Sequence, residues 1–227
     1  MKRSEINAIM AEADGFIGSF GFVLPPFARW SPAEFKALGN TSARIVGSGL
    51  GWDITDFGQN RFAGLGLILF TLRNGLLGDL RRGAGMCYAE KLLVVRRDQI
   101  TPMHTHVIKA EDIINRGGAT LAIELAGSDP AGNCDKRAGG TVYCDGLARP
   151  YRGGEVIRLP PGASVTLLPG DWHSFWGDGG DVLVGEVSTV NDDVNDNIFR
   201  DPVGRFAAVE EDCAPLHLLV SDYGKWL

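Results

Sequence analysis

The sequence predicts a mostly β protein, a small barrel or sandwich preceded by helices. Glycine is abundant, with 31 residues, and 11 prolines punctuate the chain. From about residue 60, short apolar segments alternate with Gly- and Pro-rich turns, a spacing typical of all-β sandwiches and barrels. The main apolar segments are 62–72, 91–95, 119–125, 155–159, 164–168 and 181–187.

Helical patterns precede these segments. Apolar residues near a 3.6-residue period predict a first helix, with Ile6, Ile9 and Ile17 on one face. Ser31-Pro32-Ala33-Glu34 has the Ser cap, early Pro and third-position Glu of a second helix start, and that helix should end near Gly39. We therefore expect one domain in three parts: a helical extension (1–59), the barrel (60–205) and a C-terminal strap (206–227).

Composition and charge exclude several classes of partner. The net charge is −6, and no cluster of Lys and Arg resembles a nucleic-acid footprint. The longest apolar run, at 65–72, is too short to span a bilayer. The first residues lack the apolar core of a signal peptide. We expect a cytoplasmic protein that binds a small molecule and neither nucleic acid nor membrane.

Three of the four histidines fall into a pattern that predicts a metal site. His104 and His106 are two residues apart, so on a strand both imidazoles point to one face. Glu111 follows five residues later, and His173 comes after the turn at Pro169-Gly170. Three imidazoles and a carboxylate would leave two neighbouring octahedral positions open. This nitrogen and oxygen ligand set suits Mn²⁺, Fe²⁺, Co²⁺, Ni²⁺ or Zn²⁺.

The spacing of these ligands resembles the two cupin motifs. His104-x-His106-x4-Glu111-x6-Gly118 is similar to the first motif, and Pro169-Gly-x-x-His173 is similar to the second. The second motif usually has Asn four residues after its histidine, where this chain has Gly177. The resemblance implies a jelly-roll barrel that holds one divalent ion.

Longer segments resemble the bacterial D-lyxose isomerases of the cupin superfamily. The segments that carry this resemblance are Tyr88-Ala-Glu-Lys-Leu-Leu-Val-Val, Thr101-Pro-Met-His-Thr-His, Lys109-Ala-Glu-Asp-Ile-Ile-Asn-Arg-Gly-Gly118, Leu168-Pro-Gly-Asp-Trp-His173, 186–193 and 210–212. The family is manganese-dependent, interconverts D-lyxose and D-xylulose, often accepts D-mannose and D-fructose, and is commonly a homodimer. The resemblance implies the same metal, sugar substrate and assembly for this chain, with His104, His106, Glu111 and His173 as ligands.

An aldose–ketose isomerase that works through a metal-bound cis-enediol also needs a base and a cation near the metal. Glu186 is the first candidate base, because it shares one strand face with Val182 and Val184. It could instead be a structural partner of Lys91. Lys109 is the candidate cation, although a solvated role is the usual fate of lysine.

Glu211, in the strap, is the second candidate base, although a run such as Glu210-Glu211-Asp212 would ordinarily be a solvated acidic face. Asp192 and Asp193 could bind sugar hydroxyls or serve as turn residues. Trp172 and Trp176 could stack on a sugar or fill the core.

Two other functions remain open from the sequence. The ligand set also permits a cupin Fe(II) dioxygenase, which would need a dry, apolar oxygen pocket. A non-catalytic sugar-binding cupin would need neither base nor cation. Lys109 and Glu186 favour the isomerase.

Overall fold

The computed structural model describes residues 1–193 and 195–227. Its helices are α1 (Arg3–Ser19), α2 (Pro32–Ala37), α3 (Ala43–Gly47), α4 (Leu77–Arg82) and α5 (Tyr223–Trp226). Its strands are β1 (Gly51–Thr55), β2 (Leu67–Asn74), β3 (Tyr88–Val95), β4 (Thr101–His106), β5 (Glu111–Ser128), β6 (Cys134–Asp135), β7 (Gly140–Cys144), β8 (Leu147–Tyr151), β9 (Glu155–Leu159), β10 (Ser164–Leu167), β11 (Trp172–Thr189) and β12 (Asn197–Phe199).

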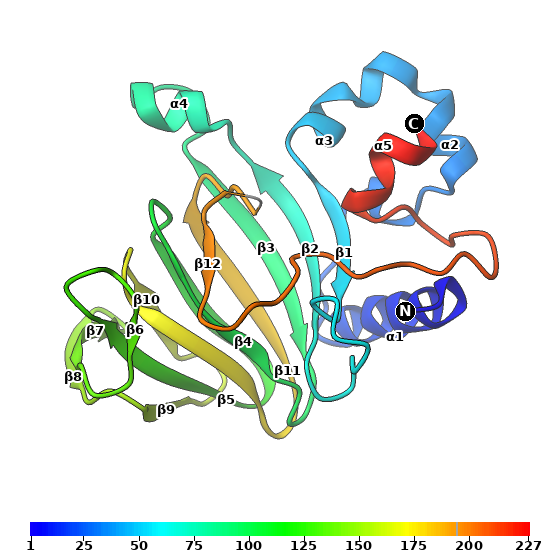
Figure 1. Ribbon diagram of the computed structural model, residues 1–227. Coiled ribbons are helices and arrows are strands. Elements are labelled where there is room, and N and C mark those ends of the chain that lie inside the picture. Colours follow the sequence, from blue (N-terminus) through cyan, green and yellow to red (C-terminus); the bar gives the residue numbers. More distant parts are fainter. Residues whose placement is uncertain (194) are drawn as a thin grey trace.

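The barrel is mostly antiparallel and confirms the predicted fold class (Figure 1). One side follows the order β1-β2-β3-β11-β5-β10-β7-β8. The other side is built around β4, which pairs with β12 and with the first half of β11, and β9, which pairs with the second half of β5. The two long strands β5 and β11 therefore run through both sides, as a jelly-roll barrel requires.

Glycines allow both long strands to bend. Gly118 in β5 has φ +94°, and a Cβ there would lie 2.3 Å from the carbonyl oxygen of Asp181. A Cβ on Gly177 in β11 would lie 2.2 Å from the carbonyl oxygen of Gly180. Because only glycine fits such close backbone approaches, Gly177 has a structural reason to stand where the second motif usually has Asn.

Alternation along the strands divides the apolar residues between two cores. In β2, Leu67 and Leu69 face the barrel interior, whereas Ile68 and Phe70 pack outward against the apolar face of α1. Helix α1 confirms the predicted first helix, and its buried face includes Ile6, Ile9 and Ile17. Figure 1 shows α1 beside β1 and β2.

The second predicted helix start is also confirmed. Ser31 caps α2 and accepts a hydrogen bond from the backbone N–H of Glu34, whose side chain returns the contact in a capping box. The C-terminal residues run along α1 and end in α5 beside α2 and α3 (Figure 1). There Tyr223 and Leu218 pack on Phe35. The three-part division into extension, barrel and strap stays a prediction.

Candidate metal centre

The structure brings the four predicted ligands together inside the barrel. His104 and His106 lie on β4, Glu111 begins β5, and His173 lies near the start of β11. All four are buried, and one candidate ligand atom from each lies within 4.8 Å of the others. His104 and His173 meet because β4 and β11 pair in a register that sets them opposite each other. The cluster could therefore hold a metal ion.

Hydrogen bonds to the backbone orient two of the imidazoles. Nδ1 of His104 lies 2.8 Å from the carbonyl oxygen of Pro102, and Nδ1 of His173 lies 3.1 Å from that of Asp171. Each contact suits an Nδ1–H donor, which leaves Nε2 with a free lone pair. Burial, with the neighbouring imidazoles of His173 and His106, holds the pKa of His104 well below its usual range. The ring is therefore neutral, the form that can bind a metal.

The polar atoms at the centre of the cluster support a metal ligand set. Oε1 of Glu111 lies 3.3 Å from Nε2 of His106 and 3.1 Å from Nε2 of His173. Within the described part of the chain, none of these three buried atoms has a well-formed hydrogen bond. Buried polar atoms without partners are costly. A cation between one carboxylate oxygen and the imidazole nitrogens would satisfy them, so this donor set fits a divalent ion.

Lys109 connects the cluster to Glu186. Its ammonium Nζ lies 2.6 Å from Oε2 of Glu111 and donates to Oε1 of Glu186 at 2.9 Å. Burial opposes the charge of Lys109, but Glu111 and Glu186 outweigh it and raise the pKa of the ammonium. Burial also opposes the charge of Glu111, and Lys109 outweighs it and holds the pKa of that carboxyl well below its usual range. Both groups are therefore charged.

Asp196 fixes the short connection between the ligands on β4 and β5. One of its carboxylate oxygens accepts from the backbone N–H groups of Val107 and Ile108, at 3.0 and 2.7 Å, and the other accepts from that of Lys109 at 2.9 Å. Asp196 is buried. Nothing local in the sequence indicates this role for Asp196, because its partners are almost ninety positions away in the chain.

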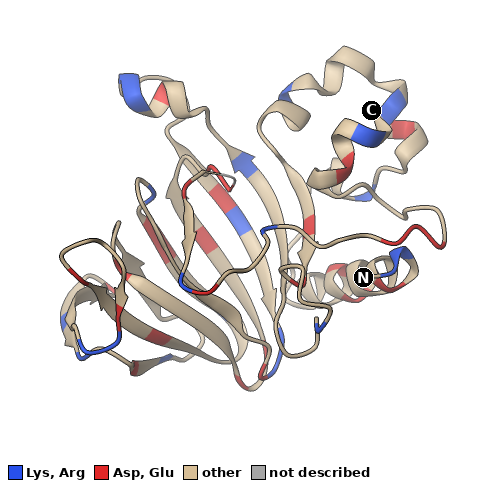
Figure 2. Cartoon of the chain, viewed as in Figure 1, with Lys and Arg blue, Asp and Glu red and all other residues tan. Residues whose placement is uncertain are grey.

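A chain of alternating charges continues from Glu186 across the barrel. Nζ of Lys91, opposite Glu186 in the β3–β11 register, lies 3.4 Å from Oε1 of Glu186 and 3.5 Å from Oδ1 of Asp193. Arg205 lies 3.1 Å from Asp193 and 2.7 Å from the fully buried Asp53. Figure 2 shows acidic and basic residues close together on the central strands. Glu186 therefore has the predicted structural partner and also lies beside the ligand cluster.

All of these charged residues except Asp53 line a small cavity, here called the inner cavity. Its volume is about 40 Å³, enough for very few water molecules. Its apolar wall includes Phe57, Phe175 and Phe199. Its polar wall is formed by the ligands on β4 and β5 together with Lys91, Lys109, Glu186, Asp193, Asn197 and Arg205.

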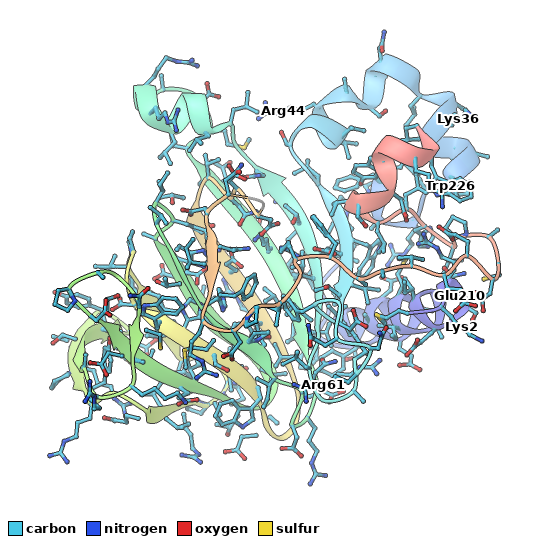
Figure 3. The ribbon with its side chains drawn as sticks, viewed as in Figure 1. Lys2, Lys36, Arg44, Arg61, Glu210 and Trp226 are labelled. Carbon is cyan, nitrogen blue, oxygen red and sulfur yellow. The ribbon has the colours of Figure 1, made fainter. Side chains whose placement is uncertain are left out.

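The remaining predicted site residues lie elsewhere. The carboxylate of Glu211 accepts from Arg3 at 2.8 Å and contacts Lys225 at 2.8 Å, and Glu211 is not among the described residues that line the inner cavity. Figure 3 labels its neighbour Glu210 beside Lys2, at the α1 side of the molecule. Trp172 is a buried residue whose indole donates to Ser128, and Trp176 lines a separate surface groove. The structure therefore brings Glu186 and Lys109 to the ligands, but not Glu211 or the tryptophans.

Comparison with known structures shows that the fold is that of a class of sugar isomerases. The L-ribose isomerase of Cellulomonas parahominis, solved with L-psicose, superposes with a TM-score of 0.61 at 16% identity over 92% of this chain and 98% of that one. The Acinetobacter L-ribose isomerase, solved with L-ribose, gives a TM-score of 0.61 at 17% identity over the same shares.

Sequence comparison identifies the family. The family model described as D-lyxose isomerase matches residues 1–223, so the chain belongs to the D-lyxose isomerase family. A D-lyxose/D-mannose isomerase of Serratia proteamaculans is 46% identical over 100% of both chains, and one of Escherichia coli is 46% identical over 98% of both. The protein is therefore a sugar isomerase. Within the described residues, no helix is long and apolar enough to cross a membrane.

Proposed function

We propose that the protein is a metal-dependent isomerase that interconverts D-lyxose with D-xylulose, and D-mannose with D-fructose. One observation carries this proposal: a carboxylate–ammonium pair, Glu186 and Lys109, lies in the same cavity as the imidazoles of His104 and His106 and the Glu111 carboxylate, which cluster with His173. The names of the 46% identical relatives support the choice of sugars.

The ion would be held by His104, His106, Glu111 and His173, and Mn²⁺ is our first choice, ahead of Co²⁺, Fe²⁺, Ni²⁺ and Zn²⁺. When bound, a divalent ion supplies Lewis-acid polarisation of the sugar carbonyl and so makes the neighbouring C–H group more acidic. The nitrogen and oxygen donors accept all of these ions, so preference among them depends on supply and geometry.

Glu186 would act as the base in this reaction. Its carboxylate removes the proton from C2 of the open-chain aldose. The electron pair of that C–H bond forms the C1–C2 double bond of a cis-enediolate, while the π electrons of the C1 carbonyl move onto O1. The protonated Glu186 then returns the proton to C1, while the O2 proton is transferred to O1. One carboxylate on one face of the intermediate is sufficient, because the proton leaves and returns on the same side.

Lys109 would stabilise the negative charge that develops on the sugar oxygens. Its ammonium is already held between two carboxylates, so it is oriented before substrate arrives. Preorganised cations in a water-poor cavity stabilise such charge more strongly than the same groups in water. Glu211 is the weaker candidate for the base because its carboxylate is held by Arg3 and Lys225.

The inner cavity favours an isomerase over the two alternatives. An Fe(II) dioxygenase would need a dry apolar space beside the ligands, whereas here Lys109 and Glu186 occupy that space. A sugar-binding module would have no need of an ammonium and a second carboxylate paired at a buried ligand cluster. Burial of charged groups costs free energy, and such groups are concentrated at catalytic sites, where they take part in the chemistry. We also propose that the enzyme is cytoplasmic and forms a homodimer, as its family commonly does.

The proposed function can be tested with a panel of sugars. Protein reconstituted with Mn²⁺ is incubated with D-lyxose, D-mannose, D-xylose and L-ribose, and the products are separated by chromatography. We expect D-xylulose from D-lyxose and D-fructose from D-mannose. Formation of ketose from neither sugar, with metal occupancy verified, would refute the proposal.

A further inference from the structure

A second and larger cavity lies next to the inner one. This outer cavity has a volume of about 390 Å³. It is formed mainly by the end of α3 and the residues after it, the connection from β2 to α4, and the loop after β11. Ligand pockets typically measure about 300–1,000 Å³, so the outer cavity has the size of a binding site and the inner cavity does not. Its lining residues are 46–49, 74–77, 190–193, Phe206 and Val220. Figure 3 labels Arg44 at this edge of the molecule, 3.4 Å from the Asn74 carbonyl oxygen.

Asp193 separates the two cavities. Among the described residues, it alone lines both of them. On the inner side its carboxylate lies 3.5 Å from Lys91 and 3.1 Å from Arg205. Lys91 is in turn 3.4 Å from Glu186, the proposed base. The side chains of Lys91 and Asp193 therefore connect the proposed base to the outer cavity.

The lining of the outer cavity includes a buried hydroxyl without a partner. Ser48 is only 5% exposed, and its Oγ forms no hydrogen bond with the residues that the structure describes. A hydroxyl that is buried without a hydrogen bond has lost its contacts with water and gained none in return, which costs free energy. A sugar hydroxyl, which is both donor and acceptor, would supply the missing partner.

The backbone around this hydroxyl is held rigidly. The Asn74 side chain donates to the carbonyl oxygen of Asn191 at 2.9 Å and accepts from its N–H at 3.0 Å, and it also donates to the Ser48 carbonyl oxygen at 3.2 Å. Nδ2 of Asn74 therefore joins two walls of the cavity. Preorganised polar groups of this kind lower the entropy cost of binding.

The charge of the lining selects against phosphorylated sugars. The described lining residues include the acidic Asp192 and Asp193 and contain neither Lys nor Arg. A phosphate group would meet these two carboxylates, and no described lining residue offers it a cation, because Lys91 and Arg205 contact Asp193 from the inner side. Phe206 and Leu76 add apolar surface that a sugar carbon chain can cover.

We propose that the outer cavity is a carbohydrate subsite that binds the end of a neutral, open-chain sugar remote from its carbonyl group. The inference rests on the proposed function, because that function places C1 and C2 at the ligand cluster. The carbon chain of the sugar passes Asp193 on its way from the inner to the outer cavity. There the sugar hydroxyls replace contacts that the Asp193 carboxylate makes with Lys91 and Arg205. A six-carbon sugar extends one hydroxymethyl group further than a five-carbon sugar, so D-mannose depends on this subsite more than D-lyxose does.

Filling the outer cavity tests this dependence. Leu76 lines the cavity and is 43% exposed, so Leu76→Trp adds bulk there without disturbing a core. Leu216 is equally exposed, at 43%, and is absent from the described lining, so Leu216→Trp is the matched control. We expect Leu76→Trp to lower kcat/KM for D-mannose about tenfold more than that for D-lyxose, a discrimination typical of one extra carbon group in a pocket. Leu216→Trp should leave both values unchanged.

Ser48→Ala tests the hydroxyl separately. Loss of one hydrogen bond should weaken D-mannose use by about two- to tenfold, with a smaller effect on D-lyxose. The subsite would be overturned if the variants changed kcat/KM equally for both sugars, or if neither Leu76→Trp nor Ser48→Ala changed it.

Calorimetry with sugar alcohols, which cannot isomerise, keeps the subsite separate from the proposed function. The wild-type protein should bind D-mannitol, and Leu76→Trp should weaken the binding of D-mannitol more than that of D-arabinitol. This outcome is expected even if neither aldose is turned over, in which case the proposed function alone fails. If Leu76→Trp weakens both polyols equally or neither, or if D-mannose 6-phosphate binds more tightly than D-mannitol, the subsite is wrong.

Discussion

Nζ of Lys109 lies 2.6 Å from Oε2 of Glu111, while Oε1 of the same carboxylate faces Nε2 of His106 and His173. One carboxylate is thus shared between the candidate metal position and the ammonium that contacts Glu186. Hydrogen bonds to a ligating carboxylate fix its orientation and influence the metal it binds. The proposed ligand set and the proposed acid–base pair are therefore one connected structure.

The first prediction concerns the loop that carries Lys109. Because Asp196 accepts three backbone N–H groups of this loop, Asp196→Ala should let Lys109 and Glu111 move and weaken Mn²⁺ binding about 10- to 100-fold. Competition with a chelator measures the affinity. Asp201→Ala is the control, since Asp201 is exposed and its carboxylate contacts Arg200. Equal affinities for both variants would show that Asp196 has no such role.

The second prediction assigns the base. Glu186→Gln keeps the shape of the side chain and removes the carboxylate, so turnover should fall about 10²- to 10⁴-fold while the metal is retained. Glu211→Gln should retain turnover within about twofold, because Glu211 is absent from the described lining of the inner cavity. Rates are measured at saturating sugar with metal content checked by elemental analysis. The reverse pattern would transfer the role to Glu211.

The third prediction concerns the route taken by the hydrogen. A carboxylate that carries the proton from C2 to C1 can exchange it with solvent during the lifetime of the enediol. Reaction in D₂O should therefore place deuterium on C1 of the ketose, as detected by NMR. A hydride shift would give no label. Complete retention at C1 of a deuterium initially on C2 would make us abandon the enediol.

The fourth prediction is a pH dependence of stability. The side-chain hydrogen bonds from Arg3 to Glu211 are the main cause that lowers the pKa of this carboxyl to about 2. Since the folded pKa is below the unfolded value of about 4.3, the stabilisation is present above that value and is lost as the pH falls towards 2. Glu211→Gln should lower the free energy of unfolding by about 1–2 kcal/mol at pH 7 and by less at pH 3.

Urea denaturation of both proteins at the two pH values gives these differences. A difference that is as large at pH 3 as at pH 7 would mean that the Glu211 charge is not the cause. The same measurements show whether the variant used as a control for catalysis is folded.

Local patterns predicted much of this structure. The two-residue spacing of His104 and His106 placed both imidazoles on one face of β4, and alternation with Val184 placed Glu186 inside the barrel, as the structure shows. The apolar period of α1 and the capping box at Ser31 also have direct local signals. These elements depend on residues that are close together in the sequence, so the sequence alone predicts them.

Other features depend on contacts that leave no local signal. Arg205 lies in an irregular segment after β12, and nothing near it in the sequence indicates that it reaches Asp53 and Asp193. Helix α4 has six residues and no buried side chain, so it lacks the apolar period by which a helix is predicted. The outer cavity arises from three segments, together with Phe206 and Val220, that meet only in the folded chain.

The central claim is that one ion at His104, His106, Glu111 and His173 makes the protein an aldose–ketose isomerase. The most direct measurement is a titration of Mn²⁺ into metal-stripped protein, with bound metal and D-xylulose formation from D-lyxose followed in the same samples. We expect isomerisation to rise with occupancy and to level off at about one ion per chain, whereas His173→Ala should bind the ion far more weakly. Stripped protein that isomerises as fast as loaded protein, or full occupancy without isomerisation, would contradict the account.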